Sequence, residues 1–578
     1  MFSRIADEVI IPFPAPLTAG ASRDKLAWVG AQLDTTKKRG QGWVSIVVGP
    51  NPALVDQVRA AHALIEPDSD FESTQANPLG LRYQVACAVL AGARGFVFRT
   101  FQPLEISGAG QGATLAALRW IHDDLTLWGP WIVGGQITAP PALSRNDFIA
   151  TAWSVSQSRL VVAATIADSA QYSLPATAAG PLQLSISAPN TPQQVFRLSG
   201  GRLERIDAEQ TAAGLTWSVT TPEPIESFII TANPLVIDFA RSHLRRQVDR
   251  RAADQLDVIS YNMGLAAKTV QARYGAFAGD PARSPAAEDM RRLGLAQRQL
   301  EQGYQALRAR QATAAIALAA QASDAIQGVL SEGFQVATSN LAAPQSSPLV
   351  VSPVALAYHW QLADACARSS WSELVIPGAG FLRPQEMEGQ GWSLEQRPLE
   401  QADLQVEFIP PAGERPAGLR LAAYPSVGLA VGGRDAANHD SESRATMSRG
   451  MGSVAIQGGY EGASSRVRSS AASVHVGQLV RVSAKARILN SPATSDSGVL
   501  IYDNQAGPSL GQLVRGAPGE VVAVELYRFV VAEGEFRLLA ECRGQCDIVL
   551  EQVTASVITP AVNRRSYTTN RQMQDASP

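Results

Sequence analysis

Cysteine and histidine are the residue types whose spacing could hold a metal ion or form a disulfide bond in this chain. Cys542 and Cys546 flank the run Arg-Gly-Gln between two apolar stretches, with Gly544 at the centre of a predicted hairpin turn. Cysteines facing each other across such a turn form a disulfide in an oxidising compartment or stay as free thiols. Zinc would need two further ligands, and the six histidines are scattered without ligand spacing. We expect no metal site, and we expect Cys87 and Cys366, which fall in helical patterns, to be buried core residues.

A glycine-rich run, Gly108 to Ala113, matches the pattern G-x-G-x-x-A of dinucleotide-binding loops. Dinucleotide binding needs the glycines to follow a strand directly, with an acidic residue about 20 positions further on. Here the sequence Gln-Pro-Leu-Glu-Ile-Ser separates Phe101 from Gly108, and the stretch after Trp131 holds no acid. We therefore predict a loop that caps the following helix, and no cofactor.

Composition limits the class of protein. A chain of 578 residues with 46% hydrophobic and 17% charged residues is globular and too long for one core, which predicts about three to five domains. With a net charge of −3, the chain lacks the excess of basic residues that binding to nucleic-acid phosphates requires, so we expect no nucleic-acid partner. No run of apolar residues is long enough to span a membrane, and the first residues lack the pattern of a signal peptide.

The first part of the chain, residues 1–138, alternates strand and helix patterns. Strands are predicted at Glu8–Ile11, Trp43–Val48 and Gly95–Phe101, with apolar residues at helical spacing between them. Strands separated by helices favour a parallel sheet. Three such units make a sheet fragment and do not close a barrel.

A resemblance to a known family rests on this region. The run 88–98, AVLAGARGFVF, followed by a long helix that ends LWGPWIVGG, resembles the end of the (β/α)8 barrel in glycoside hydrolases of the β-galactosidase clan. The resemblance implies that residues 1–138 are the last three units of an incomplete TIM-barrel-like segment. It further implies a polysaccharide or oligosaccharide as the ligand.

The chemistry of that clan requires two carboxylates at the C-terminal ends of strands, one as acid and the other as nucleophile. The strand that should carry the nucleophile ends Val48-Gly49-Pro50-Asn51, without a carboxylate, and the strand that should carry the acid would precede Met1. The sequence therefore assigns no catalytic residue. Arg99 on the last strand and Glu105 in the next loop are the polar groups expected at the mouth of the segment.

Residues 139–236 change in character. Short apolar runs separated by Pro, Gly, Asn and Ser predict an antiparallel β-sandwich. In small sandwiches of this kind tryptophans are core residues, so we expect Trp153 and Trp217 to be buried.

Residues 237–345 switch to a helical period. Apolar residues at steps of three and four predict a helical hairpin or bundle that acts as a spacer. The arginines on the opposite side, Arg241, Arg245, Arg246, Arg250 and Arg251, are interpreted as a solvated face.

Residues 346–560 return to strand patterns, and the tail 561–578 is expected to be disordered. A Pro-Gly-x-Gly-Phe motif, the pair Gly391-Trp392, the strand GQLVRV and a closing apolar and acidic strand resemble jelly-roll carbohydrate-binding modules. The family's calcium-holding acid is absent, because Leu382 follows Phe381. Modules of this kind bind sugars with flat aromatic rings and nearby polar groups. The resemblance makes Trp392, Tyr424, Tyr460 and Tyr502 candidate sugar-binding residues, together with Tyr527.

The sequence as a whole predicts a multidomain protein with an α/β segment, all-β units and an all-α spacer. Our leading interpretation is a glycan-associated protein that resembles the C-terminal part of a glycoside hydrolase and is non-catalytic as given. The resemblance places it outside the cytoplasm or at the cell surface. A structural or scaffolding surface protein, and an active glycosidase truncated at its N-terminus, remain the alternatives, and the oligomeric state is left open.

Overall fold

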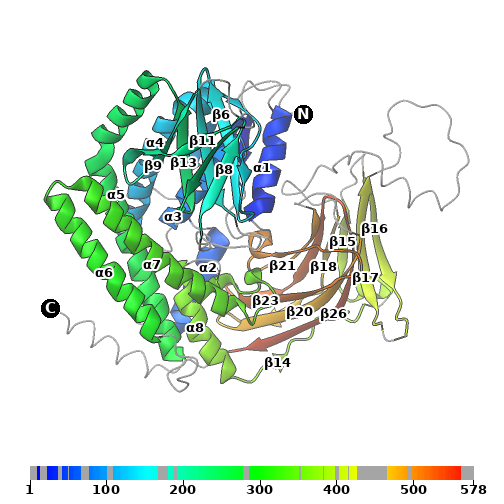
Figure 1. The fold of residues 1–578 in the computed structure, drawn as a ribbon. Helices are drawn as coiled ribbons and strands as arrows, with labels where there is room; N and C mark the ends of the chain where they lie inside the picture. Colours follow the sequence, from blue (N-terminus) through cyan, green and yellow to red (C-terminus); the bar gives the residue numbers. More distant parts are fainter. Residues whose placement is uncertain are drawn as a thin grey trace, which may run out of the picture.

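The computed structural model describes most of the chain, with several gaps. The described residues are 9–13, 22–36, 42–49, 51–66, 77–100, 109–166, 180–187, 192–211, 214–276, 286–350, 353–381, 383–396, 402–413, 415–425, 465–490 and 497–560. In this part of the chain the fold is mixed, with several sheets and helices (Figure 1). The expected disordered tail, 561–578, lies outside the described residues.

A short parallel sheet begins the fold. Its strands, in spatial order, are β1 (Val9–Pro12), β2 (Gly42–Val47) and β3 (Gly95–Arg99). The predicted strands and their parallel pairing are confirmed, with Ile10 opposite Trp43 and Trp43 opposite Gly95. Gly95 has to be glycine, because a Cβ there would lie 2.6 Å from the Trp43 ring. Within the described residues the sheet has three strands and does not close.

Helices cover this sheet and connect it to the next unit. They are α1 (Ser22–Thr36), α3 (Pro78–Leu90) and α4 (Ala109–Gly134). Side chains of α3 and α4 pack on a second sheet through Trp128, Trp131 and Trp153. The indole Nε1 of Trp131 donates a hydrogen bond to Ser158 Oγ at 3.0 Å. The end of α4 is therefore anchored in the unit that follows it.

Two antiparallel sheets follow. The six-stranded sheet has the order β10-β9-β13-β7-β6-β4 and the four-stranded sheet the order β11-β12-β8-β5. Their bounds are β4 (Gln136–Ile137), β5 (Ala142–Leu143), β6 (Phe148–Val155), β7 (Ser158–Thr165), β8 (Leu182–Ile186), β9 (Gln194–Ser199), β10 (Arg202–Ile206), β11 (Ala208–Gln210), β12 (Leu215–Val219) and β13 (Ile225–Thr231). A shared core that includes Val195, Trp217 and Phe228 joins the two sheets. Trp153 and Trp217 are both buried, as expected.

Long helices form the next part of the chain. They are α5 (Pro234–Ala276), α6 (Ala286–Arg308), α7 (Ala312–Thr338) and α8 (Pro353–Ala367), and in Figure 1 they line the side of the molecule opposite β16 and β17. The first three share a core of small and aliphatic side chains, many of them alanine. Small residues let the helices approach closely over their full length.

The interpretation of the arginines on α5 as a solvated face is wrong for Arg251, whereas Arg250 is exposed as expected and still pairs with an acid of α4. Arg251 is mostly buried and pairs with Asp124 of α4 at 2.8 Å, and Arg250 pairs with the buried Asp123. Arg82 and Arg251 also lie against the ring of Trp120. The spacing of the arginines along α5 does not show that Asp123 and Asp124 of α4 lie opposite them. The packing of α5 on α4 could therefore not be predicted from the periodicity of α5.

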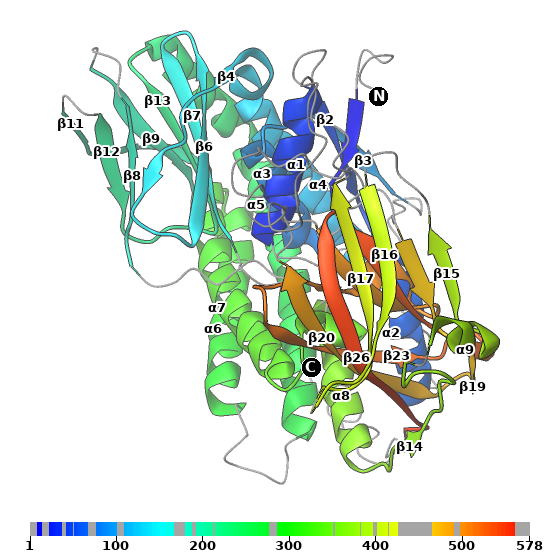
Figure 2. The same ribbon diagram turned by 90° about the vertical axis from the view of Figure 1, so that its right-hand side faces the viewer.

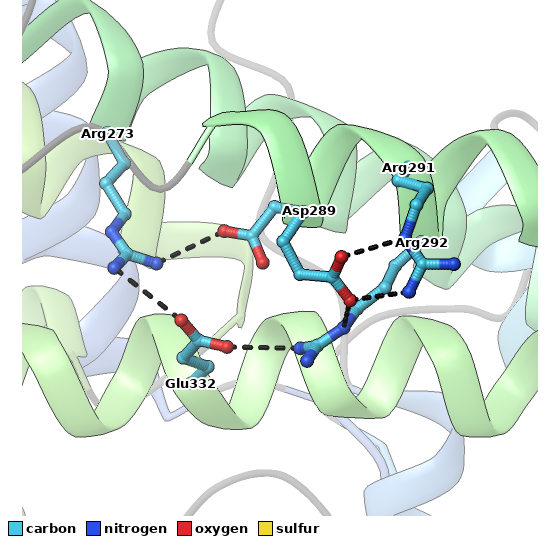
Figure 3. Close-up of polar contacts among 6 residues, drawn as sticks. Arg273, Asp289, Arg291, Arg292 and Glu332 are labelled. Carbon is cyan, nitrogen blue, oxygen red and sulfur yellow. Dashed lines mark hydrogen bonds and ion pairs between the residues drawn. The ribbon is translucent and has the colours of Figure 1, made fainter. Parts of the chain in front are cut away.

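A second ionic network holds the far end of the helices together. Arg273 of α5 contacts Asp289 of α6 at 3.3 Å and Glu332 of α7 at 3.9 Å, and Arg292 contacts Glu332 at 3.1 Å. Figure 3 shows Glu332 between the two guanidinium groups. Burial raises the pKa of Asp289, which is 1% exposed. The network joins three helices at one level.

Two further antiparallel sheets form the C-terminal unit. Sheet I has the order β16-β17-β26-β20-β23, with β14 beside β26, and sheet II has the order β15-β18-β25-β21-β22. The bounds are β14 (Ser372–Glu373), β15 (Ser393–Gln396), β16 (Ala402–Ile409), β17 (Gly418–Pro425), β18 (Ser465–Arg468), β20 (Leu479–Asn490), β21 (Gly498–Asp503), β22 (Gln512–Val514), β23 (Val521–Phe529), β25 (Leu538–Arg543) and β26 (Cys546–Ile558). One apolar core, with Leu421, Val482 and Ile501 among its members, lies between the sheets.

The helix α2 (Pro52–Ile65) leaves the parallel sheet and docks on the C-terminal unit. Figure 1 shows it beside α8, and its apolar side packs with residues of α8, β20 and β23. The Gln57 amide binds the backbone of Phe529 twice: its Nε2 donates to the Phe529 carbonyl at 3.0 Å, and its Oε1 accepts from the Phe529 N–H at 2.8 Å. A side chain thus takes the place of a neighbouring strand at the end of β23.

Replacing Gln57 with leucine is expected to lower the free energy of unfolding by about 2–3 kcal/mol, because it keeps the volume but leaves a buried N–H and C=O of Phe529 without partners. Urea unfolding followed by circular dichroism measures the change. Gln297→Ala, at an exposed position on α6, is the control and should stay within about 0.5 kcal/mol of wild type. Equal effects of the two substitutions would contradict the role of Gln57.

The stability of the protein should fall on the acid side because of His359 on α8. Burial lowers the pKa of this imidazole from 6.5 to about 4, and its ring packs edge-on against Trp360 at 5.4 Å. Below pH 6.5 the His359 imidazole binds a proton in the unfolded chain but not in the folded protein. The free energy of unfolding therefore keeps its full value above pH 6.5 and decreases as the pH falls toward 4.

In His359→Phe the free energy of unfolding should decrease less than in wild type between pH 6.5 and 4, by at most about 1.4 kcal/mol per pH unit. Urea unfolding at pH 7, 6 and 5 measures it. His122→Gln, at an exposed position on α4, should follow wild type. A pH dependence unchanged in His359→Phe would refute the assignment.

Candidate functional site

The outer face of sheet I carries a dense group of polar and aromatic side chains. Successive residues of a strand point to opposite sides of a sheet. On β17, Leu419 and Leu421 enter the core between the sheets, so Arg420 and Tyr424 lie on the other side. We call this side the outer face; its polar members are Glu407, Arg420, Tyr424, Arg481, Lys485, Arg487, Glu525, Tyr527, Asp547 and Glu551. Figure 2 shows β16, β17, β26 and β20 side by side in this sheet.

The first cluster of the outer face is centred on Arg420. Its Nε and Nη2 donate to the two carboxylate oxygens of Asp547 at 2.9 and 3.0 Å, and its Nη1 donates to Glu407 at 3.1 Å. The Tyr424 hydroxyl donates to Asp547 and accepts from Arg420. Burial, followed by the hydrogen bond to Asp547, raises the pKa of Tyr424 to about 12. The phenol therefore stays a hydrogen-bond donor at any physiological pH.

The second cluster lies at the opposite edge of the sheet, on β23. Arg481 Nε donates to Glu525 Oε1 at 2.8 Å, and the Tyr527 hydroxyl donates to the same oxygen at 3.0 Å. The Tyr527 ring lies 6.2 Å from the ring of Trp371 and 5.7 Å from the Arg481 guanidinium. Burial raises the pKa of Tyr527 to about 12. Both rings are half-buried: each packs against the apolar cluster that holds α2 and α8, and the rest of each is open to solvent.

Between the two clusters the sheet carries one further ion pair and an exposed lysine. Arg487 Nη2 donates to Glu551 Oε1 at 2.6 Å. Lys485 stands opposite Glu551 in the strand register and is exposed. Three strand spacings of about 4.8 Å, roughly 14 Å in total, separate β17 from β23. The clusters are also offset along the strands, because Arg420 is level with Arg487 of β20 whereas Glu525 is level with Ser483. An elongated ligand fits this span better than a compact one.

This geometry suits binding more than acid–base chemistry. Asp547, Glu551 and Glu525 are nearly buried, and each accepts hydrogen bonds from an arginine. Such contacts fix the carboxylates as acceptors and hold the arginines in place. In the described ranges no three histidine, cysteine or acidic side chains are arranged to hold a metal ion. The described helices include none that is long and apolar enough to cross a membrane.

Two of the residues predicted from sequence lie in cores and not at a binding surface. The expectation that Trp392 is a sugar-binding ring is wrong: it is 6% exposed, stacks edge-on with Phe381, and donates its Nε1 hydrogen bond to the Pro377 carbonyl at 2.6 Å. Tyr502 is 4% exposed and donates to Glu541 at 2.9 Å. Both rings are saturated by protein contacts and offer no face to a ligand.

The other predicted residues have mixed outcomes. Arg99 is exposed at the end of β3, remote in the chain from the outer face, and no described residue of the outer face comes from that strand. Glu105 and Tyr460 lie outside the described residues. Tyr424 and Tyr527 are on the outer face, at its two clusters. Sequence reasoning missed Arg420, whose position between Leu419 and Leu421 is the alternating signal of a polar residue on a half-buried strand.

The two cysteines of the predicted pair are not joined by a disulfide bond. Cys542 lies near the C-terminal end of β25, and Cys546 is the first residue of β26; both are buried. Their thiols are hydrogen-bonded to each other. Cys87 is buried and Cys366 half-buried, both free.

Comparisons with known proteins identify no family for this chain. No protein-family profile matches it, and no curated protein matches it. Among solved structures, a GH30 endoxylanase from Clostridium papyrosolvens C71 aligns with a TM-score of 0.24 and 10% identity, over 40% of this chain and 50% of that one. The glycoside hydrolase family 30 subfamily 8 xylanase Xyn30A from Clostridium acetobutylicum aligns with a TM-score of 0.17 and 11% identity, over 36% of this chain and 61% of that one. Scores this low carry no argument about fold or activity.

Replacing Asp547 with asparagine should lower the free energy of unfolding by about 2–3 kcal/mol, because the negative charge and one of the two buried acceptor oxygens that bind Arg420 are lost. Urea unfolding measures this loss. Glu407→Gln removes the other, 48% exposed partner of the same arginine and should cost less than about 1 kcal/mol. A larger effect at Glu407 than at Asp547 would contradict the described arrangement.

Proposed function

We propose that this chain is a glycan-associated protein, that its C-terminal unit is a jelly-roll carbohydrate-binding module, and that the outer face of sheet I binds an oligosaccharide or polysaccharide. The observation that carries the proposal is the pairing of aromatic rings with arginine and carboxylate at two places on one sheet face. Tyr527 and Trp371 lie at the edge strand β23, and Tyr424 lies on β17, next to the other edge strand.

The chemistry of sugars fits this pairing. A pyranose ring has an apolar face of C–H groups that packs on aromatic rings, and hydroxyl groups that both donate and accept hydrogen bonds. Arginine and tyrosine offer donors, and carboxylates offer acceptors, at fixed positions on the outer face. Because Arg481 and Arg420 are already held by Glu525 and Asp547, little side-chain entropy is lost when a ligand binds.

The proposal assigns binding and not hydrolysis to the chain. Glycosidic bond cleavage needs one carboxylate as nucleophile and a second, protonated one as acid. On the outer face, Glu525, Asp547 and Glu551 each lie in an ion pair with an arginine. A glycan ligand of this kind would place the protein outside the cytoplasm or at the cell surface.

A glycan array probed with the full-length protein, followed by calorimetric titration with the best ligand, tests the proposal. Tyr527→Ala and Trp371→Ala should each weaken binding about tenfold, which corresponds to the loss of about 1.4 kcal/mol of stacking. Tyr274→Ala removes a 51% exposed ring on α5 and is the matched control, with unchanged affinity expected.

Thermal unfolding of each variant verifies that the fold is intact. Absence of binding to every glycan, or equal affinity of the three variants, would overturn the proposal and favour a scaffolding role.

A further inference from the structure

The turn between β25 and β26 joins the two C-terminal sheets and holds both halves of a cysteine pair. Cys542 stands opposite Val499 in sheet II, and Cys546 stands opposite Ala423 in sheet I. Gly544 between them has φ +60°, and a Cβ there would lie 2.3 Å from Ser497 Oγ. The turn is therefore tight, and only glycine fits at its centre.

The two thiols are in contact and shielded from solvent. They share a hydrogen bond, and they are 0% and 3% exposed. Cys87 belongs to the core of the parallel sheet and Cys366, on α8, packs in the cluster that includes α2, so neither is grouped with the pair. Among the cysteines of the chain, the contact thus selects one partner for each of these two.

We propose that Cys542 and Cys546 form a reversible disulfide that ties sheet I to sheet II and fixes the strand end that carries Asp547. Asp547 follows Cys546 directly and holds Arg420 and Tyr424 on the outer face. Closing the bond restricts the backbone beneath this cluster. The effect on ligand affinity rests on the proposed function, whereas formation of the bond does not.

The chemistry needs an oxidant, for which a low-molecular-weight disulfide such as oxidised glutathione is sufficient. The thiolate of Cys542 attacks one sulfur of the oxidant and releases one glutathione thiolate. The thiolate of Cys546 then attacks Cys542 Sγ and releases the second glutathione. The protein loses two thiol protons and two electrons, and one oxidised glutathione becomes two reduced molecules. The hydrogen bond from Cys546 lowers the pKa of Cys542, which favours it as the first nucleophile.

Thiol counting on the full-length protein tests the proposal. The protein is incubated with oxidised glutathione, unfolded, alkylated and analysed by peptide mass spectrometry. A second incubation contains urea below the unfolding transition, because local opening of the turn exposes the buried pair. Two of the four cysteines should then resist alkylation, linked as Cys542–Cys546, and dithiothreitol should restore both.

Two variants complete the experiment. Cys542→Ser should leave Cys546 unable to form an internal bond, whereas Cys87→Ser should retain the link. Four alkylated cysteines under both conditions, or a link between other cysteines, would overturn the disulfide. Calorimetric titration with a glycan ligand should show binding that is at least about three-fold tighter for the oxidised protein than for the reduced protein. Equal affinities of the two forms would overturn the coupling to the outer face and leave the disulfide established.

Discussion

The buried ion pair of Arg528 and Asp503 is the constraint on which the assembly of this chain depends. Both side chains are 0% exposed, and such a pair is stable only if every remaining donor is satisfied. The guanidinium meets this condition with the backbone carbonyls of Ser346, Leu510 and Tyr527. These carbonyls come from the segment that leads into α8, from the turn before β22 and from β23 itself. Removing the arginine would leave the buried Asp503 carboxylate without its counter-charge and would take a hydrogen-bond donor from three carbonyls at the point where the helices meet the C-terminal unit.

The outer face of sheet I follows the same rule at the edge of solvent. Asp547, Glu551 and Glu525 are nearly buried, and each carboxylate accepts from an arginine on an adjacent strand. Cross-strand pairs of this kind fix the register of the sheet and also fix where donors and acceptors point. The polar surface proposed for ligand binding is thus part of what holds the strands in place. A change that improves the surface for another ligand would have to preserve this pairing.

The local parts of this fold were predictable from the sequence, and the contacts between distant parts were not. Apolar runs and their spacing predicted β2 and β3 and the burial of Trp153, because period and flanking glycines act over a few residues. The pairing of Arg420 with Asp547 joins residues 127 positions apart, and that of Arg251 with Asp124 depends on how α5 crosses α4. Trp392 was misjudged for the same reason. A tryptophan after glycine is equally compatible with a surface ring and a core ring, and only the positions of Phe381 and Pro377 decide between them.

The contact between Gln57 and Phe529 spans 472 positions of the chain. During synthesis α2 leaves the ribosome long before β23 exists, so its apolar side must wait without its partner. Loop closure over such a separation is slow, and exposed apolar helices of this kind are bound by chaperones or aggregate. The order of synthesis therefore makes α2 the last element of the first unit to find its place. Production of the intact protein should depend on how quickly the C-terminal sheets fold, even though the helix that waits for them is near the N-terminus.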